Sequence, residues 1–278
     1  TPCNAAYGFA NTLLRYVADE DPSHVAICFD AAMTSFRNAT FPAYKAQRGE
    51  TPDDLEPQFD LCREIAEVLG FASFEQDDYE ADDLIGALCE DLVRSSARAR
   101  ILTTDKDLCQ LVREDGRVDV HDLAKETTFD ADGVRGKFGV SPYQIPDYLG
   151  LVGDVVDNLP GVPGIGAKSA AAILQVFESI EAIPATAESG AWSRVQVRGA
   201  AKLAEKVSLH RDRALATKSL ATVLRDYGAA LGTVRSDSIE ESIGLLKPRG
   251  KIVSLVGPLD GAFARARGFA VEHVEVSR

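Results

Sequence analysis

The sequence predicts an α/β fold, in which helices flank a parallel sheet, followed by a second region built from helices alone. Two observations carry this prediction. In the first half of the chain, short runs rich in β-branched residues alternate with segments whose apolar residues recur at helical spacing. From Ser141 onward, helical patterns such as AKSAAAILQVF dominate. We therefore expect an α/β core over residues 1–140, a helical region over 141–235, and a C-terminal segment, 236–278, whose KIVSLV run is typical of a strand that returns to the core.

The elements of the core follow from apolar spacing and from the residues that end each run. Apolar residues at helical spacing predict a first helix over 4–17, with no strand before it in this sequence. The run HVAICF, residues 24–29, predicts a buried strand that ends at Asp30. The same reasoning predicts helices over 54–69 and 81–94 and strands over 71–75, 99–104 and 117–123.

Length and composition exclude several classes of protein. The 278 residues, 45% of them hydrophobic, suffice for a sizeable core. The chain has neither the roughly 18 continuous apolar residues of a membrane helix nor a signal peptide, which predicts a cytoplasmic protein with no membrane partner. The five cysteines stand singly beside only four histidines, so we expect reduced, buried thiols and no zinc site.

Charge is unevenly distributed along the chain. The net charge of -13 argues mildly against a nucleic acid partner. Acidic residues concentrate between residues 75 and 130, however, whereas residues 194–251 are rich in lysine and arginine. Such a division predicts a metal-binding part and a phosphate-binding part.

Acidic residues form four clusters near predicted strand ends and helix starts. Each alone has an ordinary explanation as a turn residue, a helix cap or a first-turn carboxylate. Together they would repel one another unless cations joined them, and oxygen ligands in this number suit two Mg²⁺ or Mn²⁺ ions that clamp a reacting phosphodiester. We expect Asp154 and Asp157, which are three residues apart, to face the same way on a turn of helix. The clusters are Asp30; Glu80, Asp82 and Asp83; Asp105 and Asp107; and Asp154 and Asp157.

Two further segments carry features of phosphate or nucleic acid binding. In GVPGIGAKSA, residues 161–170, glycines precede a helix start whose free N–H groups suit a phosphate, although a tight turn between helices is the alternative. A nucleotide P-loop is excluded because it would require glycine at Val162. Segment 34–54 mixes cations with aromatic rings, as single-stranded nucleic acid sites do, or is an exposed linker.

These motifs resemble the bacterial 5′-nuclease family, the flap endonuclease relatives that include the 5′-to-3′ exonuclease domain of DNA polymerase I. The resemblance rests on five segments in the family's order: FDA at 29–31, FRNATFPAYKAQR at 36–48, EADD at 80–83, TTDKDLCQLV at 103–112 and GDVVDNLPGVPGIGAKSA at 153–170. It implies a PIN-like nuclease core with a helix-three-turn-helix DNA-binding region, in the form of a monomeric, stand-alone nuclease.

The resemblance also implies roles for single residues. The clusters of Asp30 and Glu80 would serve a first metal ion, and the other two clusters a second. Segment 34–54 would be a helical arch that passes the 5′ strand, with Lys45 and Arg48 as catalytic residues near the scissile phosphate. Loop 161–169 would grip duplex DNA and hold K⁺ through its carbonyls. The DNA-binding residues would be Arg37, Tyr44, Lys45, Arg48, Gly161, Val162, Gly164, Ile165, Gly166, Lys168 and Ser169.

The function implied is a structure-specific 5′ nuclease that hydrolyses DNA phosphodiesters at 5′ ends and flaps, in primer processing and repair. The family's first strand ends in a metal-binding aspartate, which we expect to precede Thr1, so that a chain beginning at Thr1 would have impaired catalysis. The alternative is therefore a DNA-junction binding module that does not cut. A metal-dependent phosphatase would explain the carboxylates but not the glycine loop.

Overall fold

A six-stranded sheet forms the centre of the protein. The computed structural model describes residues 2–49, 51–225 and 251–256. The strand order is β2-β1-β8-β3-β4-β5, and all neighbours pair in parallel except β5, which is antiparallel to β4. The strands are β1 (His24–Asp30), β2 (Ala72–Gln76), β3 (Arg98–Leu102), β4 (Val118–Asp122), β5 (Thr127–Phe129) and β8 (Lys251–Val256).

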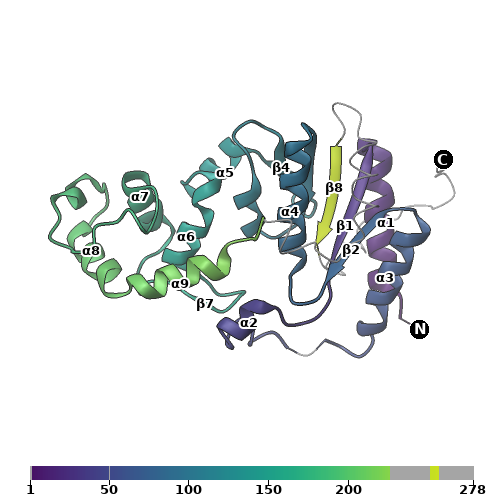
Figure 1. Ribbon diagram of the computed structural model, residues 1–278, viewed down its shortest axis with the longest axis horizontal. Helices are drawn as coiled ribbons and strands as arrows, with labels where there is room; N and C mark the ends of the chain where they lie inside the picture. The colour runs from purple at the N-terminus through teal and green to yellow at the C-terminus, as the bar shows by residue number, and fades with distance from the viewer. Residues whose placement is uncertain (1, 50, 226–250, 257–278) are drawn as a thin grey trace.

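Helices cover both faces of this sheet because its strands are apolar on both sides. On β1, Ile27 packs with residues of α1 (Asn4–Glu20) and α3 (Glu56–Val68), whereas its neighbours Ala26 and Cys28 belong to the core beneath α4 (Ala81–Arg94). Successive side chains of a strand point to opposite faces, so this alternation places α1 and α3 on one face and α4 on the other (Figure 1).

The helical region lies beside the α4 face of the sheet. It contains α5 (Ala131–Phe138), α6 (Ile145–Val152), α7 (Ala167–Phe177), α8 (Ala200–Leu209) and α9 (Arg211–Ala221). Figure 1 shows these helices, in teal and green, extending away from the sheet, with the short helix α2 (Phe36–Thr40) below the gap between the two parts. One hydrophobic cluster runs from Leu84 and Ile85 of α4 through Leu149 of α6 to Ile173 of α7, so a continuous core joins the two parts.

The predicted fold class is confirmed, with some differences in detail. The helix predicted over 81–94 is α4, and 251–256 forms the central strand β8; the remainder of the predicted 236–278 segment lies outside the described residues. The prediction that Asp154 and Asp157 share a turn of helix is wrong. Asp154 belongs to β6 (Gly153–Asp154), which pairs with β7 (Leu159–Pro160) in a small hairpin, and Asp157 lies in the turn between them.

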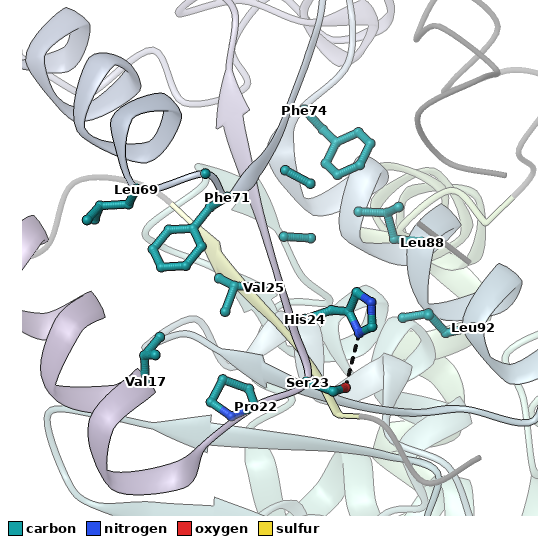
Figure 2. A pocket seen from close by; sticks show the side chains of 13 residues that line it. Val17, Pro22, Ser23, His24, Val25, Leu69, Phe71, Phe74, Leu88 and Leu92 are labelled. Carbon is teal, nitrogen blue, oxygen red and sulfur yellow. Dashed lines mark hydrogen bonds between the residues drawn. The ribbon is translucent and has the colours of Figure 1, made fainter. Parts of the chain in front are cut away.

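Three further observations complete the description of the fold. A pocket of about 310 Å³ opens at the amino end of β1, lined mainly by apolar side chains such as Phe71, Phe74 and Leu92, with His24 hydrogen-bonded to Ser23 (Figure 2). It contains no carboxylate and lies at the opposite end of β1 from Asp30. Within the described ranges, every helix is too short or too polar to cross a bilayer. The five cysteines are free, and all but Cys3 are buried.

Candidate metal centre and nucleic-acid interface

Seven of the eight predicted metal-binding carboxylates meet at one edge of the molecule, which we call the acidic rim. The carboxyl end of β1, the start of α4, the loop after β3 and the β6–β7 hairpin all contribute to it. The carboxyl ends of parallel strands share one edge of a sheet, and the hairpin reaches this edge from the helical region. The members of the rim are Asp30, Glu80, Asp82, Asp105, Asp107, Asp154 and Asp157.

Local hydrogen bonds fix the backbone around the rim. Asp30 Oδ1 accepts a 2.8 Å hydrogen bond from the Ala81 amide, which ties the end of β1 to the first residue of α4. Asp105 Oδ1 accepts a 2.8 Å bond from the Asp107 amide, and the Asp105 amide donates to Thr103 Oγ1 at 2.9 Å. The carboxylates are therefore held by turns that short polar side chains stabilise.

Crowding and burial make it costly to charge all of these carboxylates at once. Burial, and then the carboxylate of Asp105, raise the pKa of Asp107 to about 8. The pKa of Asp82 lies well above its ordinary value because of burial and because of Asp105 and Glu80. Burial also raises the pKa of Asp157, although Lys45 and Arg48 lower it. Carboxylates in this state gain the most from a nearby cation.

Protein cations lie among the carboxylates. Lys45 Nζ donates to Glu80 Oε1 at 2.7 Å, and Arg48 Nη2 lies 2.9 Å from Asp157 Oδ1. Lys106 Nζ donates to Asp154 Oδ2 and lies 3.6 Å from Asp107 Oδ1. Burial lowers the pKa of Lys45, but Glu80 and Asp157 raise it further, so the net shift is upward and the side chain is an ammonium ion.

The donor set of the rim fits divalent cations, although it is not arranged around one. In the described part of the chain, no three histidine, cysteine, aspartate or glutamate side chains are placed to hold one metal ion. Carboxylate oxygens are nevertheless the ligands that Mg²⁺ and Mn²⁺ prefer, and the buried Asp107 Oδ1 lacks a hydrogen-bond partner. Metal ions would take the place of the ammonium and guanidinium groups that now face these oxygens.

The eighth predicted metal ligand, Asp83, does not face the rim. Its side chain is fully buried, and its two oxygens accept hydrogen bonds from Arg37 Nη1 and Nη2 at 2.6 and 2.8 Å. Arg37, predicted to contact DNA, is likewise only 2% exposed. The geometry assigns both residues to a buried ion pair, because a bidentate carboxylate has little capacity left for a metal ion and a buried guanidinium cannot reach DNA.

The predicted arch is folded down onto the β6–β7 hairpin. The Lys45 amide donates to the Asp157 carbonyl at 3.0 Å, and Gln47 Nε2 donates to the carbonyls of Val155 and Val156 at 2.7 and 3.0 Å. The Tyr44 ring, expected to stack on bases, is 3% exposed, and its hydroxyl lies 3.0 Å from Glu80 Oε2. In this arrangement Tyr44 orders the rim, while Lys45 and Arg48 are the arch cations nearest to it.

The predicted glycine loop combines a buried anchor with an exposed backbone. Val162 and Ile165 are buried, so these two predicted DNA-binding residues can contribute only main-chain groups. A side chain at Gly161 would meet the Val152 backbone at 2.3 Å, and Gly164 has φ +75°, so both positions require glycine. Gly166 precedes α7 and provides no side-chain cap, which leaves the first amides of that helix available to a ligand.

Lysine side chains lie around this loop. Lys168 is exposed in the first turn of α7, Ser169 is half-buried, and Lys206 Nζ lies so close to Gly164 that a side chain there would meet it at 2.4 Å. Among the described residues neither lysine forms an ion pair. An amide-bearing helix start with unpaired lysines beside it is a suitable site for a phosphate backbone.

Sequence reasoning missed Lys106 and Gln110. Lys106 stands between Asp105 and Asp107 in the sequence, and an isolated cation inside an acidic motif could have indicated an internal counter-ion. Gln110 is 1% exposed and binds the last residue of α9 and the chain that follows it. Only its unusual polarity within the apolar run LCQLV marks it in the sequence.

Comparison with known proteins relates the chain to nucleases. Residues 1–139 match a family described as 5′-3′ exonuclease, N-terminal resolvase-like domain, and residues 140–239 match 5′-3′ exonuclease, C-terminal SAM fold. A protein named 5′-3′ exonuclease from Aquifex aeolicus is 41% identical over 182 residues, which cover 66% of this chain and 62% of that protein. DNA polymerase I of Bacillus subtilis is 37% identical over 225 residues, 80% of this chain but 25% of the polymerase. The chain thus spans about a quarter of the polymerases it matches.

Solved structures show the same fold. T5 5′-exonuclease with bound zinc superposes with a TM-score of 0.66 at 20% identity, over 86% of this chain and 89% of that one. A variant of the bacteriophage T5 flap endonuclease, solved as a pseudo-enzyme-product complex with DNA and metal ions, gives a TM-score of 0.65 at 20% identity, over 86% and 88% of the two chains.

Proposed function

The chain belongs to the 5′-3′ exonuclease family, and on that premise we propose that it is a divalent-metal-dependent 5′ nuclease acting on DNA at 5′ ends and single-strand/duplex junctions. The observation that supports this most directly is the acidic rim, in which seven carboxylates from both parts of the molecule share one edge. Such a concentration of buried acid is favourable only when cations neutralise it.

We assign the metal ions to the two halves of the rim. Asp30, Glu80 and Asp82 would hold the first ion, and the second would be held by Asp105, Asp107, Asp154 and Asp157. When bound, two Mg²⁺ or Mn²⁺ ions supply an activated water and stabilise the charge that develops on the phosphodiester. Asp83 is excluded from this set because Arg37 occupies its oxygens.

The chain's own residues orient and hold the DNA. Lys45 and Arg48, which reach Glu80 and Asp157 from the arch, would turn to the non-bridging oxygens of the scissile phosphate once the carboxylates bind metal. The exposed amides of α7, with Lys168, would hold the backbone of the downstream duplex without reading its sequence. We further propose that the carbonyls of the glycine loop hold a K⁺ ion. We also propose that the protein acts as a monomer, in primer processing and repair.

A test of this proposal compares a 5′-flap duplex with the same duplex lacking the flap. In Mn²⁺ we expect the protein to release the flap within a nucleotide or two of the junction, and in EDTA to release nothing. Binding to both DNAs, measured in Ca²⁺, should be of similar strength, because the duplex is held at the glycine loop. If the flap substrate gave no product with Mg²⁺ and none with Mn²⁺, the proposal would be contradicted.

A second candidate is a junction-binding module that does not cut. It is favoured by the finding that, within the described ranges, no three acidic, histidine or cysteine side chains are set to hold one ion. Lys45, Arg48 and Lys106 instead pair with three carboxylates of the rim, Glu80, Asp157 and Asp154. Junction binding in Ca²⁺ with no product after Mn²⁺ is added would support this candidate over the first.

A further inference from the structure

We propose that Arg37 and Asp83 act as a positioning pair that sets the distance between the duplex-holding loop and the acidic rim, and so determines which phosphodiester is cut. The inference rests on the proposed nuclease function. It concerns residues that touch neither metal nor DNA. Their contacts instead join three parts of the molecule: the base of the arch, the start of α4 and the chain that leaves α9.

The pair itself is buried and geometrically complete. Arg37 Nη1 and Nη2 bind the two oxygens of Asp83 at 2.6 and 2.8 Å, and the side chains are 3% and 0% exposed. A buried ion pair contributes little net stability compared with an apolar pair of the same size. Its directional hydrogen bonds, however, permit only one relative placement of α2 and α4.

The same two side chains hold the crossing segment, residues 220–225, which comprises the last two residues of α9 and the chain that continues across α4. Arg37 Nε donates to the Leu220 carbonyl at 2.8 Å, and Nη2 donates to the Thr222 carbonyl at 3.0 Å. Asp83 Oδ1 accepts from the Leu224 amide at 2.9 Å. Both members of the pair therefore bind the main chain of this segment, which fixes its path without regard to its side chains.

The crossing segment is clamped from its other side by Gln110, which follows the third acidic cluster. Gln110 Nε2 donates to the Ala221 carbonyl at 2.9 Å, and its Oε1 accepts from the Val223 amide at 2.9 Å. Gly86 of α4 lies against the segment so closely that a side chain there would meet the Leu224 carbonyl at 2.4 Å. Little freedom remains between the end of α9 and the rim.

Further contacts extend from this clamp to the two sites. In α9, Thr217 Oγ1 donates to the Pro160 carbonyl at 2.8 Å, directly before the glycine loop. On the rim side, Arg37 Nη1 lies 3.3 Å from Glu80 Oε2, and the Glu80 amide donates to Asp83 Oδ2 at 3.3 Å. A rigid path therefore runs from the duplex-holding loop through α9 and the pair to Glu80 of the first metal site. The length of this path sets where along the strand the rim meets the backbone.

The test measures cut positions rather than activity alone. Arg37→Lys keeps the charge but loses the bidentate geometry, and we expect it to spread the cut over neighbouring phosphodiesters of an end-labelled 5′ flap in Mn²⁺. We expect kcat to fall about 10- to 100-fold, as for the loss of a residue that orients a metal ligand, while KM and duplex binding in Ca²⁺ stay at wild-type values. The matched control is Arg100→Lys, because Arg100 binds Asp119 bidentately at 2.7 and 3.0 Å on the sheet, away from the path. It should cut at wild-type positions.

Two further variants keep the inference falsifiable if Arg37→Lys does not fold. Asp83→Asn removes the charge while keeping the shape, and Thr217→Val removes only the hydroxyl that binds Pro160. Each variant should spread cleavage over neighbouring phosphodiesters. The spread should be wider in Asp83→Asn, because this change weakens several hydrogen bonds rather than one. A folded variant of this set that cuts at the wild-type position with wild-type kcat would overturn the inference and leave the nuclease function intact. If the wild-type protein failed to cut any flap, both the positioning inference and the proposed nuclease function would be overturned.

Discussion

At the residue scale, the carboxylates of the acidic rim that suit metal binding also lower the stability of the metal-free protein, because they repel one another. Asp82 has an elevated pKa because burial and two neighbouring carboxylates disfavour its charge. An uncharged isostere relieves that repulsion but cannot bind a metal ion as a carboxylate does. Residues of this kind are expected at a metal site that is used for chemistry.

Asp82→Asn should therefore abolish cleavage and stabilise the metal-free protein. We expect the rate in Mn²⁺ to fall by more than the roughly 10- to 100-fold that loss of an outer-shell partner costs, with duplex binding in Ca²⁺ unchanged. In EDTA the melting temperature should rise, by about 2–4 °C for each kcal/mol of repulsion relieved. A lower melting temperature in EDTA would show that Asp82 is not held against repulsion.

The pH dependence of stability follows from the raised pKa of Asp107, about 8. In the unfolded chain this carboxyl has a pKa near 4, so between about pH 4 and 8 the folded state binds more protons than the unfolded state. Stability contributed by this group is thus present at low pH and decreases as pH rises toward 8. In EDTA, we expect the urea midpoint to fall from pH 5 to pH 8, less steeply in Asp107→Asn, and saturating Mg²⁺ should flatten the wild-type curve. A wild-type midpoint that rises over this range would contradict the assignment.

The sequence predicted the residue types of the site better than their partners. Strand ends and helix starts placed seven carboxylates at the rim, because parallel strands converge at one edge. The sequence could not, however, predict that Asp83, one residue beyond Asp82, turns inward to Arg37, which lies 46 residues away along the chain. Adjacent positions of a first helical turn point in different directions, and which one meets metal depends on packing that no local pattern contains. Packing also explains why Tyr44, which the sequence predicted to contact DNA, is buried instead.

At the element scale, the junction between α4 and the crossing segment depends on one glycine. A side chain at Gly86 would meet the Leu224 carbonyl at 2.4 Å and the Val223 side chain at 2.6 Å. Glycine within a helix is otherwise unfavourable, so its presence in α4 is explained by this close approach.

Gly86→Ala should accordingly destabilise the protein by about 1–3 kcal/mol, as overpacking does, despite the better helix propensity of alanine. Gly136→Ala in α5 is the matched control, since nothing lies within 4 Å of the added carbon there. It should raise stability by about 0.5–1 kcal/mol. Urea unfolding of both variants measures the difference, and equal effects would mean that the crossing segment does not rest on α4.

Regular elements were predicted well where periodicity and end signals agree. The helix expected over 81–94 begins with Glu80 as cap and has a continuous buried stripe, and its observed bounds are the same. The β6–β7 hairpin and β5 were missed, because strands of two or three residues carry no periodicity. The 3-10 helix Asp107–Leu111 is likewise too short to show a helical period.

At the scale of the whole molecule, a chain of net charge -13 is proposed to bind a polyanion. The charges differ from one region to the next, because the acidic rim lies at the sheet edge and on the β6–β7 hairpin, whereas Lys168 of α7 and Lys206 of α8 lie beside the glycine loop. Exposed charges further apart than about 8 Å, the Debye length at physiological salt, are largely screened from one another. Local charge, and not net charge, therefore governs the duplex contact.

Binding to blunt duplex DNA in Ca²⁺ should consequently depend on salt through these lysines. The logarithm of the association constant should fall linearly with the logarithm of the salt concentration, with a slope of about -0.9 for each phosphate contacted. Lys168→Ala should weaken binding to all sequences equally and reduce the magnitude of the slope by about 1. Arg98→Ala is the control, because Arg98 is exposed at the amino end of β3, opposite the rim, and its removal changes the net charge by the same amount. If net charge controlled binding, both variants would shift the slope equally; a change in Lys168→Ala alone would place the phosphate contacts at the glycine loop.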